Sequence, residues 1–175
     1  MKLLAGDVFA TKNPNGLGRA ICLAQKVKSP DGKAEYGHTG IIQTPDGKTL
    51  EAVWKIAEQN LFEAYKGNKV LVARLKNNDV KGLKSGLQKV LPLRDRIYPA
   101  HRLFLHAIGL ARWIHFLKTP VCSELTAMFL VACGVPMSFD DNYWGITPDN
   151  LVDEWRISKH FDIIFEGILD GTIRA

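Results

Sequence analysis

Residues 116–136 read "FLKTPVCSELTAMFLVACGVP", and this stretch predicts a helix. The rest of the chain is interpreted relative to this helix. Thr119-Pro120 is typical of a helix start, and a stripe of apolar side chains follows it at helical spacing. We therefore expect a helix over about residues 121–133. Cys122 then lies in or beside the first turn, where unpaired N–H groups and the helix dipole stabilise a thiolate.

The second cysteine of this stretch, Cys133, has a different expected role. It follows Cys122 by 11 residues. That spacing places it on the same side of the helix but roughly 16 Å further along the axis. Such a separation excludes a disulfide or a shared zinc ion while the helix is intact. Cys133, and Cys22 in the apolar run "AICLA", are therefore expected to be buried.

Length and composition suit one globular domain over residues 1–175, because 46% of the chain is hydrophobic. Three cysteines are too few for a disulfide framework and favour a reducing compartment or free thiols. No apolar segment near the N-terminus is long enough for a signal peptide, so we expect a cytoplasmic protein or one released without a cleavable signal. The most apolar window, residues 103–117, contains Arg112 and predicts a buried amphipathic helix, not a transmembrane segment. A helix at a membrane interface is the alternative.

The net charge of +5 is distributed unevenly along the chain. Residues 66–118 hold 12 Lys and Arg against two acidic residues, whereas residues 119–175 hold 3 basic and 9 acidic residues. A basic segment of this kind is typical of a solvated helix face, or of a surface that attracts an anionic polymer or a membrane. The sequence has neither zinc-finger spacing nor an aromatic-rich RNA-binding motif, so no specific nucleic-acid partner is expected.

Strands and helices are both predicted, which places the chain in the α+β class. The run "HTGIIQTPDGKTLEAVW" (38–54) predicts a β-hairpin, because Pro-Asp-Gly-Lys between β-branched runs is a turn signal. Thr147 is suited to cap a helix that begins with Pro148 and extends to about residue 157. Other strands are predicted at 6–11, 69–75 and 161–169, and other helices at 18–28, 79–91 and 99–117.

A thiolate nucleophile needs a general base, and five histidines are available. His101, His106 and His115 lie on one predicted helix, at spacings that do not place them on a common face. His160 follows the predicted helix near the C-terminus. His38 differs, because it opens a strand among small residues that leave space around its ring. Residue type alone makes His38 either a base or a structural histidine.

Four segments, taken in order, resemble the circularly permuted NlpC/P60 papain-like cysteine hydrolase family. They are "GDVFAT" (6–11), "YGHTGII" (36–42), "KTLEAVW" (48–54) and "PVCSELTAMFLVACGVP" (120–136). This family includes YiiX-like and YebB-like bacterial hydrolases and is related to lecithin:retinol acyltransferase-like enzymes. The resemblance covers about residues 6–54 and 118–136, and it leaves a predicted helical insert at about 76–117 unmatched.

The resemblance implies an antiparallel sheet packed on a helix that carries the cysteine at its N-terminus. It implies Cys122 as the nucleophile, His38 as the general base and Glu51 as the residue that orients the imidazole. It implies neither a metal ion nor an organic cofactor. Tyr36, Tyr143 and Trp144 are candidate substrate-binding residues, with core packing as the alternative for all three.

The spacing between His38 and Glu51 depends on the turn that joins the two predicted strands. If Asp46-Gly47 is a two-residue turn, Ile42 pairs with Glu51, and His38 lies four residues further along its strand. At strand rise this separation is about 13 Å. Either a bulge or a longer loop shortens the separation, or another residue orients His38.

Three functional classes follow from these residues. The first is a hydrolase that cleaves a peptidoglycan peptide, another amide or a lipid ester through an acyl-enzyme on Cys122. The second is an acyltransferase that works at a membrane surface. The third is a non-catalytic binding or structural module of a phage or cell-envelope assembly.

Overall fold

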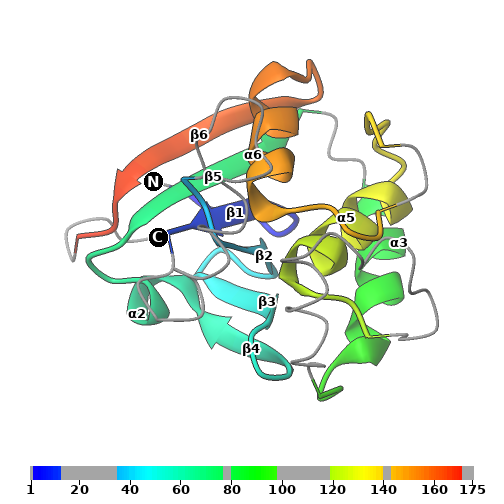
Figure 1. The fold of residues 1–175 in the computed structure, drawn as a ribbon, viewed down its shortest axis with the longest axis horizontal. Helices are drawn as coiled ribbons and strands as arrows, with labels where there is room; N and C mark the ends of the chain where they lie inside the picture. The colour runs from blue at the N-terminus through cyan, green and yellow to red at the C-terminus, as the bar shows by residue number, and fades with distance from the viewer. Residues whose placement is uncertain (1, 13–34, 77–79, 98–118, 140–142, 171–175) are drawn as a thin grey trace.

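The computed structural model describes residues 2–12, 35–76, 80–97, 119–139 and 143–170 (Figure 1). One antiparallel sheet has the strand order β4-β3-β2-β1-β5-β6. Its strands are β1 (Val8–Thr11), β2 (His38–Ile42), β3 (Lys48–Ala52), β4 (Ile56–Asn60), β5 (Lys69–Leu75) and β6 (Phe161–Ile168). The helices are α2 (Leu61–Ala64), α3 (Val80–Val90), α5 (Cys122–Ala132) and α6 (Pro148–Ile157), with the 3-10 helix η1 (Leu91–Leu93).

The architecture confirms the α+β class. The predicted helices at 18–28 and 99–117, and Cys22, lie outside the described residues. Within the unmatched segment 76–117, the described residues form α3 and η1. No helix in the described part of the chain is long and apolar enough to cross a membrane.

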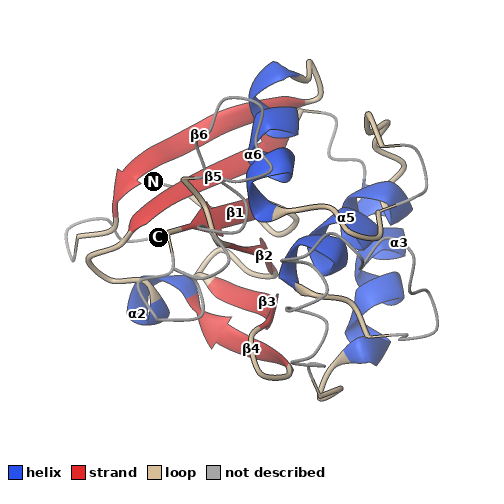
Figure 2. Ribbon diagram, viewed as in Figure 1, coloured by secondary structure: helices blue, strands red, loops and turns tan. Residues whose placement is uncertain are grey.

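The sheet carries a hydrophobic core on each face. The larger core lies between the sheet and the helices α3, α5 and α6, which Figure 2 shows grouped together beside it. The smaller core joins Phe9 and Ile42 to Leu61 and Tyr65, which come from α2 and the residue after it. Because successive strand residues point to opposite faces, alternate residues of β2 join different cores. Ile41 belongs to the larger core, whereas Ile42 belongs to the smaller one.

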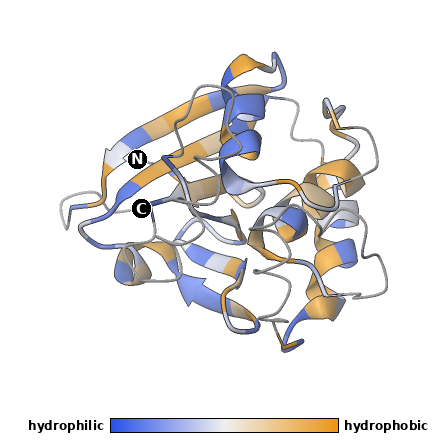
Figure 3. Cartoon of the chain, in the orientation of Figure 1, coloured by the Kyte–Doolittle hydropathy of each residue, from blue (hydrophilic) through white to orange (hydrophobic). Residues whose placement is uncertain are grey.

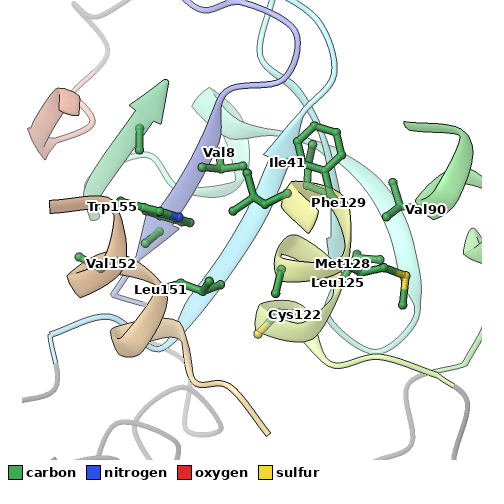
Figure 4. Close-up of a cluster of buried hydrophobic side chains, with 14 of the residues drawn as sticks. Val8, Ile41, Val90, Cys122, Leu125, Met128, Phe129, Leu151, Val152 and Trp155 are labelled. Atoms are coloured by element: carbon green, nitrogen blue, oxygen red, sulfur yellow. The ribbon is translucent and has the colours of Figure 1, made fainter. Parts of the chain in front are cut away.

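Helix α5 is buried along most of its length, including three polar residues of its first turns, Ser123, Glu124 and Thr126. Figure 4 shows Ile41 of β2 in the same cluster as Phe129 of α5, with Cys122 at the start of the helix. On another side α3 approaches so closely that a Cβ at Gly86 would lie 2.4 Å from Cys133 Sγ. The helix ends before Gly134, whose φ of 79° is typical of a helix C-terminus. Its bounds agree with the predicted helix within one residue.

The register of the hairpin formed by β2 and β3 differs from the register that a two-residue turn at Asp46-Gly47 would give. Ile42 pairs with Thr49, and Gly40 pairs with Glu51. The Gln43 N–H donates to the Lys48 carbonyl at 2.7 Å, so the loop contains four residues, 44–47. Of the two alternatives, the longer loop is the one observed, and it shifts Glu51 by two residues toward His38 relative to a two-residue turn.

Strand β4 was not predicted from the sequence. It forms one edge of the sheet and reads "IAEQN", which Figure 3 shows as largely hydrophilic. Polar side chains at an edge discourage pairing with another chain. They also remove the hydrophobic alternation by which a strand is recognised, which explains why this strand was missed.

Candidate active site

Cys122 is the first residue of α5 and is 4% exposed. Its helix has no hydroxyl side chain at the N-cap position, Val121. The Glu124 carboxylate at the N3 position supplies the reciprocal bond of a capping box, because its Oε2 accepts the N–H of Val121 at 3.0 Å. The thiol therefore lies at the N-terminal end of a well-anchored helix, beside the unpaired N–H groups of its first turn.

His38 and Glu51 are joined by a buried hydrogen bond between neighbouring strands. His38 Nε2 lies 2.8 Å from Glu51 Oε2, and the two side chains are 5% and 0% exposed. The observed register makes Glu51 the partner of Gly40, so His38 is its diagonal neighbour. Long side chains at diagonal positions reach each other on one face of a sheet. The longer loop thus removes the gap of about 13 Å that a two-residue turn implied.

Gly40 provides the space through which Glu51 reaches His38. A Cβ at Gly40 would lie 3.0 Å from Glu51 Cγ and 2.6 Å from the Phe9 ring. Contacts that close displace at least one neighbour, and both neighbours here are buried. The absence of a side chain at Gly40 is therefore part of the site geometry.

The imidazole of His38 is also coupled to Cys122. Burial lowers the pKa of His38, but the charge of Cys122 and a hydrogen bond to it, followed by Glu51, outweigh burial and raise the pKa to about 10. Because Nε2 faces Glu51, Nδ1 is the nitrogen left for the Cys122 thiol. The structure therefore brings Cys122, His38 and Glu51 together from α5, β2 and β3.

Two further side chains, which the sequence analysis did not single out, bind Glu51. Thr49 Oγ1 donates to Glu51 Oε1, and the Tyr65 hydroxyl donates to Glu51 Oε2. Thr49 precedes Glu51 by two residues on the same strand face, which is a signal that sequence could have supplied. Tyr65 has no such signal, because only the packing of α2 against the sheet brings it to the site.

The residues after Cys122 hold a second segment against α5. Ser123 Oγ donates to the Ile146 carbonyl at 2.7 Å, and the Gly145 N–H donates to Glu124 Oε1 at 2.9 Å. These bonds anchor the segment that follows Tyr143 and Trp144, whose rings lie 5.3 Å apart and are partly buried. Their role in substrate binding stays a prediction.

Tyr36 does not offer a surface to a substrate, so its core-packing alternative is the better description. It is fully buried, and its hydroxyl donates to Glu166 at 2.9 Å. Burial, reinforced by Glu166, raises the pKa of Tyr36 to about 12. The cations of Lys69 and Arg156 lie 5.5 Å and 5.9 Å from its ring centroid, so Tyr36 joins β5, β6 and α6.

Cys133 is partly buried at the C-terminal end of α5, three turns from Cys122. Burial raises the pKa of its thiol to about 11, so it is protonated at neutral pH. Across the described ranges, no group of three or more His, Cys, Asp or Glu side chains is arranged to hold a metal ion.

No known protein family matches the sequence, and no curated protein matches it. The fold is similar to the crystal structure of YiiX, a metalloprotein from Escherichia coli O157:H7. The TM-score is 0.65 at 13% sequence identity, and the similarity covers 96% of this chain and 99% of YiiX. The likeness to YiiX-like proteins is therefore one of fold, and it extends well beyond the segments 6–54 and 118–136 that suggested it.

Proposed function

We propose that this protein is a cysteine-dependent hydrolase that cleaves an amide or ester bond through an acyl-enzyme on Cys122. The observation that carries the proposal is the position of His38, which contacts the buried Glu51 carboxylate through Nε2 and is coupled to Cys122. A peptidoglycan peptide, another amide or a lipid ester is the proposed substrate.

We also propose that the fold is a circularly permuted papain-like fold of the NlpC/P60 type. The support is the chain order, because the strand with His38 precedes the helix with Cys122. The fold likeness to YiiX adds to this support. YiiX is described as a metalloprotein. Among the described residues of this chain, no group of three or more His, Cys, Asp or Glu side chains is arranged to hold a metal ion, and the proposed reaction uses none.

The first half of the reaction forms the acyl-enzyme. The proton of Cys122 resides on His38 Nδ1, which leaves a thiolate beside an imidazolium. The thiolate sulfur attacks the substrate carbonyl carbon, and the C=O electron pair moves to oxygen. Backbone N–H groups at the start of α5 stabilise this oxyanion. The carbonyl then re-forms, and the departing amine or alcohol takes the proton from His38 Nδ1.

The second half releases the acyl group. Neutral His38 accepts a proton from water at Nδ1 as the water oxygen attacks the thioester carbon. This proton transfer forms the imidazolium, and collapse of the second tetrahedral intermediate then expels the Cys122 thiolate beside it. Glu51 accepts the His38 Nε2–H throughout and stabilises the positive charge on the ring.

The test uses p-nitrophenyl acetate, a small ester suited to a thiol that is only 4% exposed. We expect acetylation of Cys122, located by peptide mass spectrometry after an acid quench, and a burst of p-nitrophenol followed by slower turnover. Cys122→Ala should abolish both signals. Cys133→Ala is the matched control on the same helix and should retain them.

The same experiment separates the rival functions. Absence of acetylation at Cys122, with turnover equal to that of Cys122→Ala, would overturn the proposal and favour a non-catalytic module. If the acyl-enzyme forms but is released faster to an added amine or alcohol than to water, the protein is an acyltransferase.

A further inference from the structure

Glu51 is a fully buried carboxylate whose two oxygens both accept hydrogen bonds. Oε1 accepts from the Thr49 hydroxyl, and Oε2 accepts from the Tyr65 hydroxyl and contacts His38 Nε2. A buried charge is tolerated only when hydrogen bonds replace the water it has lost. The two neutral hydroxyls therefore stabilise the buried Glu51 carboxylate.

Tyr65 is placed to donate a hydrogen bond to Glu51. Burial, followed by the charge of Glu51 and the hydrogen bond to it, raises the pKa of Tyr65 well above its usual range. The hydroxyl is therefore protonated at neutral pH. The Tyr65 proton is directed at Oε2, so Glu51 accepts this hydrogen bond.

The ring of Tyr65 also lies against the imidazole. The ring centroids of Tyr65 and His38 are 6.0 Å apart, and Phe9 lies 5.5 Å from Tyr65 and 6.3 Å from His38. These contacts restrict the plane in which the imidazole can lie. A phenylalanine at position 65 would keep the ring contacts and lose only the hydroxyl.

These contacts determine which nitrogen of His38 carries the proton when the ring is neutral. A Glu51 carboxylate held as an acceptor at Oε2 requires a proton on His38 Nε2. Nδ1 is then unprotonated and suited to accept the proton of Cys122. If Glu51 could rotate, the opposite tautomer would become populated, and Nδ1 could no longer act as a base.

We propose that Tyr65 is a positioning residue of this site: with Thr49 it fixes Glu51 as an acceptor, and through Glu51 it fixes the tautomer of His38 that faces Cys122. This inference rests on the proposed function for its meaning in catalysis. The positioning itself does not depend on turnover, so the two can be tested separately.

The experiment compares Tyr65→Phe with Tyr36→Phe. Both remove a hydroxyl that donates to a glutamate, but the glutamate bound by Tyr36 is Glu166, outside the site. The ¹⁵N chemical shifts of His38 are titrated in a Cys122→Ala background, where loss of the coupling to Cys122 brings neutral imidazole into an accessible pH range. We expect Tyr36→Phe to retain a single Nε2–H tautomer.

Tyr65→Phe should show mixed tautomers and a titration midpoint for His38 lowered by about one pH unit, the equivalent of one weakened hydrogen bond. An unchanged tautomer and midpoint in Tyr65→Phe would overturn the inference. If Tyr65→Phe does not fold, Thr49→Val against Thr49→Ser gives the same comparison, because serine retains the hydroxyl and should rescue the tautomer.

Kinetics then separate the inference from the proposed function. With Cys122 restored, Tyr65→Phe should lower the kcat for p-nitrophenyl acetate about 10- to 100-fold with little change in KM. If the His38 tautomer responds but the unaltered protein shows no turnover, the positioning stands and the hydrolase proposal fails. If the unaltered protein turns over and Tyr65→Phe matches it in both kcat and the His38 tautomer, the hydrolase stands and the positioning fails.

Discussion

Gly40 and Glu51 lie directly opposite each other in the antiparallel pair of β2 and β3. This pairing places the carboxylate on the same sheet face as His38, two residues away along β2. It also requires that residue 40, directly opposite Glu51, carries no side chain, because a Cβ at Gly40 would meet Glu51 Cγ at 3.0 Å.

Gly40→Ala should therefore damage both stability and the site. The added methyl group would lie 2.6 Å from the buried Phe9 ring, so we expect the free energy of unfolding to fall by about 1–3 kcal/mol. Urea denaturation measures this loss, and the p-nitrophenyl acetate burst reports on the displaced Glu51. Gly167→Ala, on β6 with its closest contact at 3.3 Å to Phe165, is the control and should change both readouts little. Equal behaviour of the two variants would contradict the role of Gly40.

The pH dependence of turnover should follow His38. Its pKa is raised from 6.5 to about 10, so the protonated ring stabilises the folded protein. This contribution is fully present below pH 6.5 and is lost as the pH rises through about 10. We expect turnover to fall over the same alkaline limb, because the leaving group can no longer take a proton from His38.

The Cys122→Ala variant separates the causes of that raised pKa. Because Cys122 raises the pKa of His38 by its charge and hydrogen bond, the variant should titrate at a lower pH by NMR. Cys133→Ala should leave the titration unchanged. A midpoint that is the same in both variants would show that Cys122 and His38 are not coupled.

The thiols of Cys122 and Cys133 should differ in reactivity. Burial raises the pKa of Cys133 to about 11, so its unreactive thiol form predominates at neutral pH. With iodoacetamide near pH 7, we expect Cys122 to be carboxamidomethylated first, as measured by peptide mapping over time. His38→Ala should slow labelling of Cys122 and leave Cys133 unaffected. Preferential labelling of Cys133 would argue against an activated Cys122.

Glu51→Gln should lower kcat about 100-fold or more, because an amide cannot stabilise the imidazolium as a carboxylate does. The His38 midpoint should also fall, since Glu51 helps to raise it. Glu58→Gln is a matched control on β4, where the carboxylate pairs with Lys48 and Arg94 near the surface. If both variants turn over the ester like the unaltered protein, Glu51 does not orient His38.

Glu124→Ala should destabilise the protein and impair the site. It removes the acceptor for the N–H groups of Val121 and Gly145, at a cost of about 1–2 kcal/mol in the free energy of unfolding. Turnover should also fall, because the start of α5 and the segment at Gly145 lose their link. Glu154→Ala on α6 removes bonds to Ser138 and should lower stability without a comparable loss of kcat. A matching loss of kcat in both variants would indicate a general effect of stability.

Elements with strong local signals could be predicted closely from the sequence. The strand at 69–75 and the helix at 148–157 match β5 and α6, and the cysteine helix matches α5 within one residue. Caps, apolar spacing and β-branched runs act between near neighbours in the chain, so they can be recognised from the sequence alone. Strand β4 lacks such a signal and was missed.

By itself, the sequence determined that Cys122 begins a helix and that His38 and Glu51 belong to one hairpin. Only the tertiary structure decided that they meet. The Leu61 N–H donates to the Gly47 carbonyl, and Asn60 Nδ2 donates to the Asp46 carbonyl. The donors of these two hydrogen bonds lie beyond the hairpin, and the acceptors lie in its four-residue loop. The bonds are therefore present together with the register that the loop gives. Tyr65 reaches Glu51 for the same reason, since pairing of β4 with β3 carries α2 beneath the sheet, and no pattern within a short window of sequence encodes that contact.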